Sequence, residues 1–125
     1  MIVAGFGFRA AATVADLRDA LDQTGAQPDA LASITEKARA AQLQQLAQEL
    51  DLPLIALEEH EISGETTLSC SPRIKARFGT GSLAEAAAKA GARKDTKGIS
   101  VRLLGPRIKT ANGMATVAIA ERTKP

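Results

Sequence analysis

The sequence predicts a single α/β domain over residues 1–125, in which helices cover both faces of a mostly parallel, mixed sheet of about five strands. Short apolar runs alternate with segments that have helix caps and a helical spacing of apolar residues. Two further apolar runs close the sequence with no helical segment between them, which favours an antiparallel pair. The chain is long enough to bury a core of its own. Because strands and helices alternate, we expect three layers, α/β/α.

Local signals near the N-terminus indicate the first strand and the first helix. Residues 1–6 are mostly apolar and run into glycines, which is typical of a short buried strand. Thr13 is placed to cap a helix, with Asp16 at the capping-box position three residues later. Gly25 predicts the end of this helix, and Pro28 follows it.

The next part of the chain repeats the alternation of strand and helix. Residues 30–35 predict a second strand, and residues 38–50 predict a helix whose leucines fall on one face. Residues 53–57 are mostly apolar, so we expect a third strand that is buried on both faces. Residues 58–62 are predicted to form a single helical turn.

A long connection and a strongly marked helix follow. Residues 63–81 are predicted to be irregular, because glycine and serine are interspersed there with basic residues. Ser82 predicts the N-cap of an alanine-rich helix, Glu85 completes a capping box, and Gly91 predicts its left-handed end. The start of this helix is suited to an anion, although an ordinary capped surface helix explains the same residues equally well.

The last two strands are predicted over residues 99–104 and 115–120, where apolar residues alternate or run together. Gly105-Pro106 and Asn112-Gly113 interrupt the chain between them, which is typical of loops and turns. The two strands therefore complete one side of the sheet.

The composition argues against several classes of function. Three Phe with no Trp or Tyr argue against recognition of single-stranded nucleic acid by stacking. One cysteine, Cys70, and one histidine, His60, are too few for a structural zinc site, and no metal or other cofactor is indicated. No apolar run is long enough to span a membrane and no signal peptide is evident, so we expect a cytoplasmic protein with no membrane partner.

Charge is distributed unevenly along the chain. Residues 1–65 contain four Lys/Arg and eleven Asp/Glu, a net charge of −7, whereas residues 66–125 contain twelve and three, a net charge of +9. This division favours a basic face that meets an anionic partner. If the two halves of the sequence mix in space, however, the field cancels. A pI near 8.9 does not by itself indicate a nucleic-acid partner, since no nucleic-acid-binding motif is present.

Candidate binding residues follow from the predicted sheet, because ligands of open α/β sheets bind beyond the carboxyl ends of the strands. The candidates are Gly5, Gly7, Arg9, Ser33, Lys37, Gly79, Thr80, Gly81, Ser82, Arg107 and Lys109. The two glycines near the N-terminus do not form a dinucleotide-binding loop, since Ala10 occupies the position of its third glycine. Catalytic residues cannot be identified by pattern, although Lys37 and His60 are candidates for moving a proton.

Five segments occur in an order that resembles one known family. They are residues 3–9 (VAGFGFR), 32–37 (ASITEK), 50–55 (LDLPLI), 79–88 (GTGSLAEAAA) and 115–120 (ATVAIA). Together they resemble the CobE family of cobalamin-biosynthesis proteins, which is similar to the C-terminal domain of CbiG. The resemblance covers nearly the whole chain.

The resemblance implies a role in making the corrin ring of vitamin B12, with a precorrin or corrin intermediate as the partner. Such intermediates have several acetate and propionate side chains, so each is a multivalent anion. The predicted basic residues are of the types that hold carboxylates by charge-assisted hydrogen bonds. The resemblance therefore leads us to expect a basic cleft at the carboxyl ends of the strands, with Phe6, Phe8 or Phe78 as an apolar floor.

Three functions are compatible with this resemblance. The chain is an accessory protein that binds a precorrin and passes it on, or an enzyme that acts on it. CbiG itself opens the lactone of a cobalt-precorrin and releases acetaldehyde, so a lactone hydrolase is the form of enzyme that the resemblance implies. The third function is a module that docks onto a precorrin methyltransferase or another enzyme of the corrin pathway.

Overall fold

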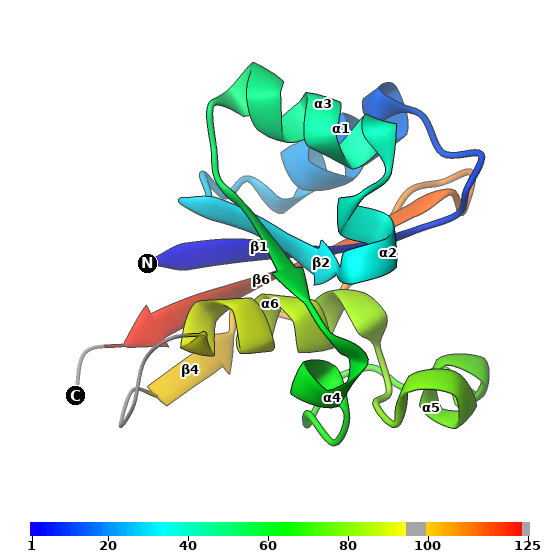
Figure 1. Ribbon diagram of the computed structural model, residues 1–125, viewed down its shortest axis with the longest axis vertical. Helices are drawn as coiled ribbons and strands as arrows, with labels where there is room; N and C mark the ends of the chain where they lie inside the picture. Colours follow the sequence, from blue (N-terminus) through cyan, green and yellow to red (C-terminus); the bar gives the residue numbers. More distant parts are fainter. Residues whose placement is uncertain (95–99, 124–125) are drawn as a thin grey trace.

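The computed structural model describes residues 1–94 and 100–123, which form an open mixed sheet with helices on both faces (Figure 1). The strands are β1 Ile2–Phe8, β2 Ala30–Ile34, β3 Leu54–Leu57, β4 Ser100–Leu103, β5 Ile108–Lys109 and β6 Ala115–Thr123. The helices are α1 Val14–Thr24, α2 Thr35–Ala38, α3 Ala41–Leu50, α4 Glu59–Ile62, α5 Pro72–Phe78 and α6 Leu83–Arg93. The predicted α/β class is confirmed.

The sheet has the order β3-β2-β1-β6-β4, with β5 also paired to β6. The β1–β2 and β2–β3 pairs are parallel, whereas β6 is antiparallel to β1, β4 and β5. The sheet is therefore mixed, as expected, and has six strands among the described residues. The predicted antiparallel pair near the C-terminus is β4 with β6, and the two-residue β5 was not predicted.

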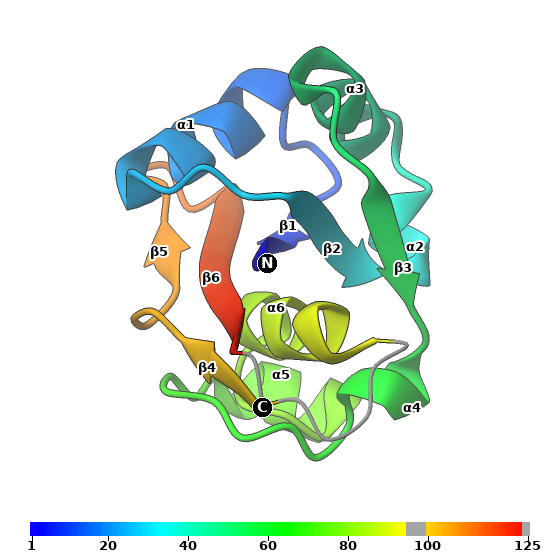
Figure 2. The same ribbon diagram turned by 90° about the vertical axis from the view of Figure 1, so that its left-hand side faces the viewer.

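The helices lie in two layers, with α1 and α3 on one face of the sheet and α6 on the other (Figures 1 and 2). Because side chains alternate along a strand, β1 supplies both layers. Ala4, Phe6 and Phe8 belong to the core that includes residues of α1 and α3. Val3 belongs to the core formed around α6, and Gly5 and Gly7 also face that helix. The strand therefore joins two separate cores.

Helix α6 approaches the sheet very closely. A Cβ atom added to Gly5 would lie 2.2 Å from the carbonyl oxygen of Ala84 and 2.4 Å from the backbone N of Ala88. A Cβ atom added to Gly91 would lie 2.9 Å from the Cβ of Ala32. Since α6 presents mostly alanines, nine of its eleven residues are buried. The helix is thus a central element of the core, and the interpretation of a surface helix is wrong.

Several predicted boundaries need correction. Strand β1 continues through Phe8, because Gly7 and Phe8 still pair with Thr116 and Ala115 of β6. The predicted helix over residues 38–50 is divided into α2 and α3 by Ala40, whose ψ of 136° is extended. The strand predicted over residues 99–104 is β4, which begins at Ser100 and ends at Leu103, and residue 99 lies outside the described residues.

The connection over residues 63–81 is not wholly irregular, because α5 lies within it. Pro72 stands in the first turn of α5, and Gly79 ends the helix with a φ of 73°. This arrangement, proline at the start and glycine just after the end, is a typical helix signal that the prediction overlooked.

The prediction that Gly91 ends the following helix is also wrong. Helix α6 continues to Arg93. Glycine is required at position 91 because a side chain there would collide with the sheet, and not because the backbone adopts a left-handed conformation. Ser82 is the N-cap as predicted and accepts a hydrogen bond from the backbone N–H of Glu85 at 3.3 Å. The carboxylate of Glu85 does not complete a capping box, because it accepts its hydrogen bonds from Ser69.

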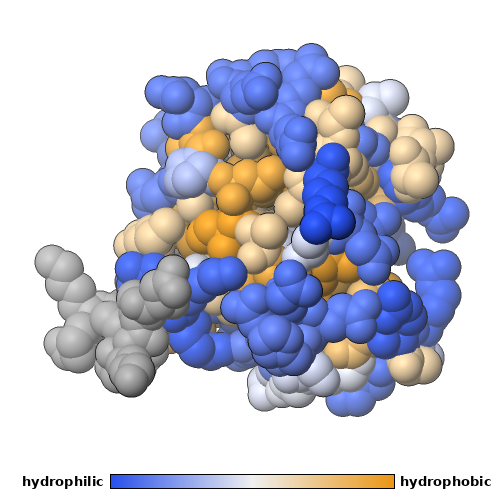
Figure 3. Space-filling model, viewed as in Figure 1, coloured by the Kyte–Doolittle hydropathy of each residue, from blue (hydrophilic) through white to orange (hydrophobic). Residues whose placement is uncertain are grey.

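The prediction that the third strand is buried on both faces is wrong. Strand β3 is at one end of the strand order, and Leu54 and Ile55 are only partly buried while Ala56 is exposed. Figure 3 shows apolar surface in the middle of this face of the molecule, where β3 runs in Figure 1. Within residues 1–94 and 100–123, no helix has the length and apolar character required to cross a membrane.

The predicted cap of α1 is confirmed and also links distant parts of the chain. The hydroxyl of Thr13 accepts from the N–H of Asp16, whose carboxylate accepts from the N–H of Thr13. The same carboxylate accepts from the side-chain amide of Asn112 at 2.9 Å. Helix α1 ends at Gly25 with a φ of 68°, as predicted. The cap therefore ties the turn before β6 to α1.

Replacement of Gly5 by alanine should strongly destabilise the fold. The added methyl group would overlap the backbone of α6, which cannot move aside as a side chain can, so we expect a loss of about 3 kcal/mol or more. Thermal unfolding of Gly5→Ala measures this loss. Gly7→Ala is the control, because the nearest atom to its Cβ lies 3.6 Å away. Equal stability of the two variants would contradict the close contact of α6 with β1.

Asp16 should make the stability of the protein depend on pH. The backbone N–H of Thr13, and after it the side chain of Asn112, lower the pKa of Asp16 below its ordinary value. A lowered pKa in the folded state adds stability above the unfolded-state pKa, and this is lost as the pH falls through the folded-state pKa. We expect Asp16→Asn to lower the free energy of unfolding at neutral pH and to differ little from the wild type in acid. Denaturant unfolding of both proteins from neutral to acidic pH tests this expectation, with Asp22→Asn as the control. A difference in unfolding free energy between Asp16→Asn and the wild type that does not change with pH would contradict it.

Candidate functional site

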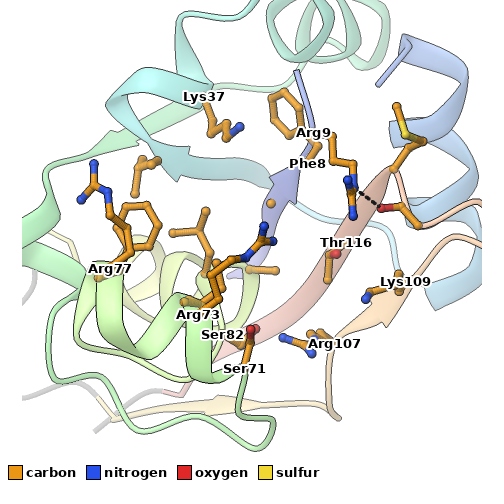
Figure 4. A pocket seen from close by; sticks show the side chains of 18 of the residues that line it. Phe8, Arg9, Lys37, Ser71, Arg73, Arg77, Ser82, Arg107, Lys109 and Thr116 are labelled. Atoms are coloured by element: carbon orange, nitrogen blue, oxygen red, sulfur yellow. Dashed lines mark hydrogen bonds between the residues drawn. The ribbon is translucent and has the colours of Figure 1, made fainter. Parts of the chain in front are cut away.

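A pocket of about 470 Å³ lies where β1 and β2 end and α6 begins; we call it the strand-end pocket. Six cationic side chains line it, which are Arg9, Lys37, Arg73, Arg77, Arg107 and Lys109. Glu36 is the only acidic residue among the described lining residues. Figure 4 shows the six cations arranged around the hollow, with Ser71, Ser82 and Thr116 among them. The lining is therefore strongly cationic.

Separate parts of the chain supply these cations. Arg9 follows β1, and Lys37 belongs to α2, directly after β2. Arg73 and Arg77 are on one side of α5, four residues apart. Two more come from β5 and the residues before it. The site therefore depends on the tertiary fold and on the position of α5.

The floor of the pocket is apolar. Its side chains come from both cores and from α5, and they include Phe8, Ile34, Ile74, Phe78, Leu83 and Met114. The ammonium group of Lys37 lies 5.1 Å from the centre of the Phe8 ring, and the guanidinium of Arg77 lies 4.5 Å from the Phe78 ring. These distances allow cation–π attraction, which holds two of the cations beside the apolar floor.

Five of the six cations have no acidic partner among the described residues. Within residues 1–94 and 100–123 no ion pair is formed by Arg9, Lys37, Arg73, Arg107 or Lys109. Arg77, in contrast, contacts Glu59 at 2.8 Å and Glu36 at 3.7 Å. The pocket thus contains positive charge that the described part of the chain does not neutralise.

A tethered turn fixes one side of the pocket. The Nε of Arg9 donates to the carbonyl of Gly113 at 3.3 Å, drawn as the dashed line in Figure 4. Asn112 in the same turn accepts from the hydroxyl of Thr110 at 2.6 Å and donates to Asp16 on α1. Because α1 is capped at that point, the turn and Arg9 have a defined position.

The start of α6 faces the same hollow. Ser82, Leu83 and Ala84 line the pocket, and Leu83 and Ala84 belong to the first turn, where backbone N–H groups lack partners within the helix. These N–H groups and the helix dipole favour an anion. The helix start thus adds to the attraction of the surrounding cations.

The structure gathers six of the eleven predicted binding residues around this pocket: Gly7, Arg9, Lys37, Ser82, Arg107 and Lys109. The other five, Gly5, Ser33, Gly79, Thr80 and Gly81, lie outside its lining. The hydroxyl of Ser33 donates to the carbonyl of Phe6 at 2.8 Å, and that of Thr80 donates to the carbonyl of Glu65 at 2.9 Å. Both hydroxyls therefore take part in buried structural hydrogen bonds.

The three predicted glycines outside the pocket have packing or backbone roles. Gly5 admits the backbone of α6, and Gly79 adopts the left-handed conformation after α5. A Cβ atom on Gly81 would lie 2.5 Å from the carbonyl oxygen of Ser69. These glycines therefore shape the segments around the pocket without lining it.

His60 and Phe6 also lie outside the strand-end pocket. His60 is an exposed residue of α4 beside Glu58 and Glu59, in a separate depression at the ends of β2 and β3. Phe6 is fully buried in the core that includes residues of α1 and α3. Of the two residues suggested for proton transfer, Lys37 is therefore the one that lines the pocket.

Arg73 and Arg77 were not among the predicted binding residues. Both belong to α5, which was expected to be irregular. The proline and glycine that bracket α5 could have identified the helix, and the four-residue spacing would then have placed both arginines on one face. Their orientation toward the ends of β1 and β2 depends on tertiary contacts.

Comparisons with known proteins agree with this fold. Residues 2–120 match the profile of the family described as cobalamin synthesis G C-terminus. The crystal structure of CobE, a protein from the cobalamin (vitamin B12) biosynthetic pathway, is similar with a TM-score of 0.85 and 32% identity, over 100% of this chain and 95% of that chain.

A second solved structure is the cobalamin biosynthesis protein chiG from Agrobacterium tumefaciens. It is similar with a TM-score of 0.71 and 31% identity, over 99% of this chain and 100% of that chain. No curated protein sequence matches the chain significantly. The family match over most of the chain and the two structures lead to one conclusion: the chain belongs to the CobE and CbiG C-terminal family of cobalamin biosynthesis proteins.

Proposed function

We propose that this protein binds an anionic precorrin or corrin intermediate in the strand-end pocket. The supporting observation is the set of six cations and one carboxylate around an apolar floor. Precorrins have a flat apolar macrocycle with acetate and propionate groups on its edge. Such a ligand would place its ring on the floor and its carboxylates against the cations, as charge-assisted hydrogen bonds require.

Three of the five cations without an ion pair are the strongest candidates for carboxylate contacts. Arg73, Arg107 and Lys109 have neither an acidic partner nor a ring contact among the described residues, so a ligand would not have to break an ion pair to reach them. Arg9, in contrast, already donates to the carbonyl of Gly113. Lys37 is held beside the floor by its contact with Phe8. A cationic hollow also raises the local concentration of an anionic ligand and its association rate.

The types of residue that line the described part of the pocket favour binding over catalysis. They include no His, Cys or Asp, and their one carboxylate, Glu36, lies 3.7 Å from the guanidinium of Arg77. A lactone hydrolase needs a base or nucleophile that is free to act on the ligand. Lys37 is then the remaining candidate for proton transfer, and the proposed role for it is to hold a carboxylate.

Binding of the proposed ligand should depend on Arg73 far more than on Lys75, two residues further along α5. Both are exposed cations of α5, but Lys75 does not line the pocket, which makes it a matched control. Loss of a charge-assisted hydrogen bond should weaken binding in Arg73→Gln by about tenfold, whereas Lys75→Gln should change affinity by less than about twofold. Titration with hydrogenobyrinic acid, a corrin with free carboxylates, followed by visible absorption, measures both affinities.

Other results of this titration would contradict the proposal. Absence of binding by the folded wild-type chain at micromolar ligand would favour the module that docks onto a corrin-pathway enzyme. A spectral change that proceeds with time, using a precorrin as ligand, would indicate an enzyme. In that case Lys37→Ala should abolish turnover, whereas for a binding protein it only weakens affinity.

A further inference from the structure

One segment beside the pocket holds two of its arginines but buries little surface. We call residues 64–79 the arm; it includes α5. No residue of α5 is fully buried, and Ile74 and Phe78 are the side chains of α5 that pack partly against the core. Apolar burial therefore contributes little to fixing the position of α5, and polar contacts elsewhere in the arm become important.

Backbone hydrogen bonds close the two ends of the arm. The N–H of Gly64 donates to the carbonyl of Gly79 at 3.0 Å, and both glycines have a positive φ. The N–H of Ser71 donates to the carbonyl of Gly81 at 2.7 Å, directly before α5. The arm is therefore a closed loop, and its interior needs its own anchor to the body of the molecule.

A buried carboxylate on α6 supplies such an anchor. Glu85 is fully buried, and its carboxylate accepts hydrogen bonds from the N–H of Ser69 at 2.8 Å and from the hydroxyl of Ser69 at 3.3 Å. Burial of a charged group is costly unless the group is hydrogen-bonded. Both side-chain hydrogen bonds of Glu85 go to the arm, three residues before α5 begins.

The same face of α6 holds the arm at a second point. Lys89 and Arg93 follow Glu85 at intervals of four residues, and both form ion pairs with Glu65 at the base of the arm. The side chain of Glu65 is only 10% exposed. Lys89 also donates to the carbonyl of Thr66 at 3.0 Å. One face of α6 thus contacts the arm at two points and holds it in place.

We propose that Glu85 is a positioning residue of the strand-end pocket. By holding Ser69, it sets where α5 begins and therefore where Arg73 and Arg77 point. This inference rests on the proposed function, since the arginines matter only if they contact an anionic ligand. It adds a specific role for a buried carboxylate that does not itself line the pocket.

A double-mutant cycle tests this role. We expect Glu85→Gln to weaken binding of hydrogenobyrinic acid by about tenfold in the wild-type background. In a chain that already has Arg73→Gln and Arg77→Gln, the same change should have no further effect, because Glu85 acts through those side chains. A loss of equal size in both backgrounds, or no loss in the wild-type background, would overturn the proposal.

Limited digestion with trypsin gives a second readout that needs no ligand. Trypsin cleaves after Lys and Arg, and the arm contains Arg73, Lys75 and Arg77. Glu85→Gln should accelerate cleavage in the arm more than elsewhere, since a loosened arm opens locally more often. Unchanged cleavage would overturn the anchoring role even if the wild type binds the corrin.

The outcomes separate this inference from the proposed function. If the wild-type chain does not bind hydrogenobyrinic acid, the proposed function fails, and with it the effect of Glu85 on a ligand. If the wild type binds and the cycle shows no coupling, only the positioning role fails. Should Glu85→Gln not fold, Ser69→Ala removes the hydroxyl hydrogen bond to Glu85 and takes its place in both measurements.

Discussion

The close contact of α6 with the sheet is the constraint on which the rest of the structure depends. Gly5 leaves room for the backbone of α6 at Ala84 and Ala88, and Gly91 leaves room for Ala32. This contact places the first turn of α6 beside the carboxyl end of β1. It also directs Glu85, Lys89 and Arg93 toward the arm. A larger side chain at Gly5 would therefore disturb the core, the helix start and the anchor of α5 together.

The fold redistributes the uneven charge of the sequence between ion pairs and the strand-end pocket. Several acidic residues of the first half pair away from the pocket, as Glu49 does with Arg18, Glu61 with Lys94, and Glu65 with two cations of α6. Cations from both halves line the pocket, where Glu36 is the single described acid. The charges of the two halves are therefore partly neutralised by ion pairs, and positive charge remains concentrated at the strand ends.

Features that depend on residues close together in the sequence were predictable from it. The caps at Thr13 and Ser82, the end of α1 at Gly25 and most strands rest on local signals, and the structure agrees with them. The family was also recognised, because its segments keep their order. The helix end predicted at Gly91 is wrong because the role of this residue is contact with a distant strand. Similarly, a short apolar run does not reveal that β3 is at the edge of the sheet.

The candidate site was predictable only in part for the same reason. Arg9 and Lys37 follow strands directly, so the rule for open sheets selects them. Arg73 and Arg77 depend on a helix that the prediction overlooked and on contacts between the arm and α6. The role proposed for Glu85 depends on burial, which sequence does not show. Tertiary contacts therefore supply the part of the site that local patterns omit.

The central claim is that carboxylates of a corrin intermediate meet the cations of the strand-end pocket. A crystal structure of the protein with hydrogenobyrinic acid tests this claim most directly. We expect ligand carboxylates within hydrogen-bond distance of Arg73, Arg107 or Lys109, and the ring against Phe8 or Leu83. A ligand located elsewhere, such as the apolar groove lined by Leu104, Ile108 and Ile119, would contradict it.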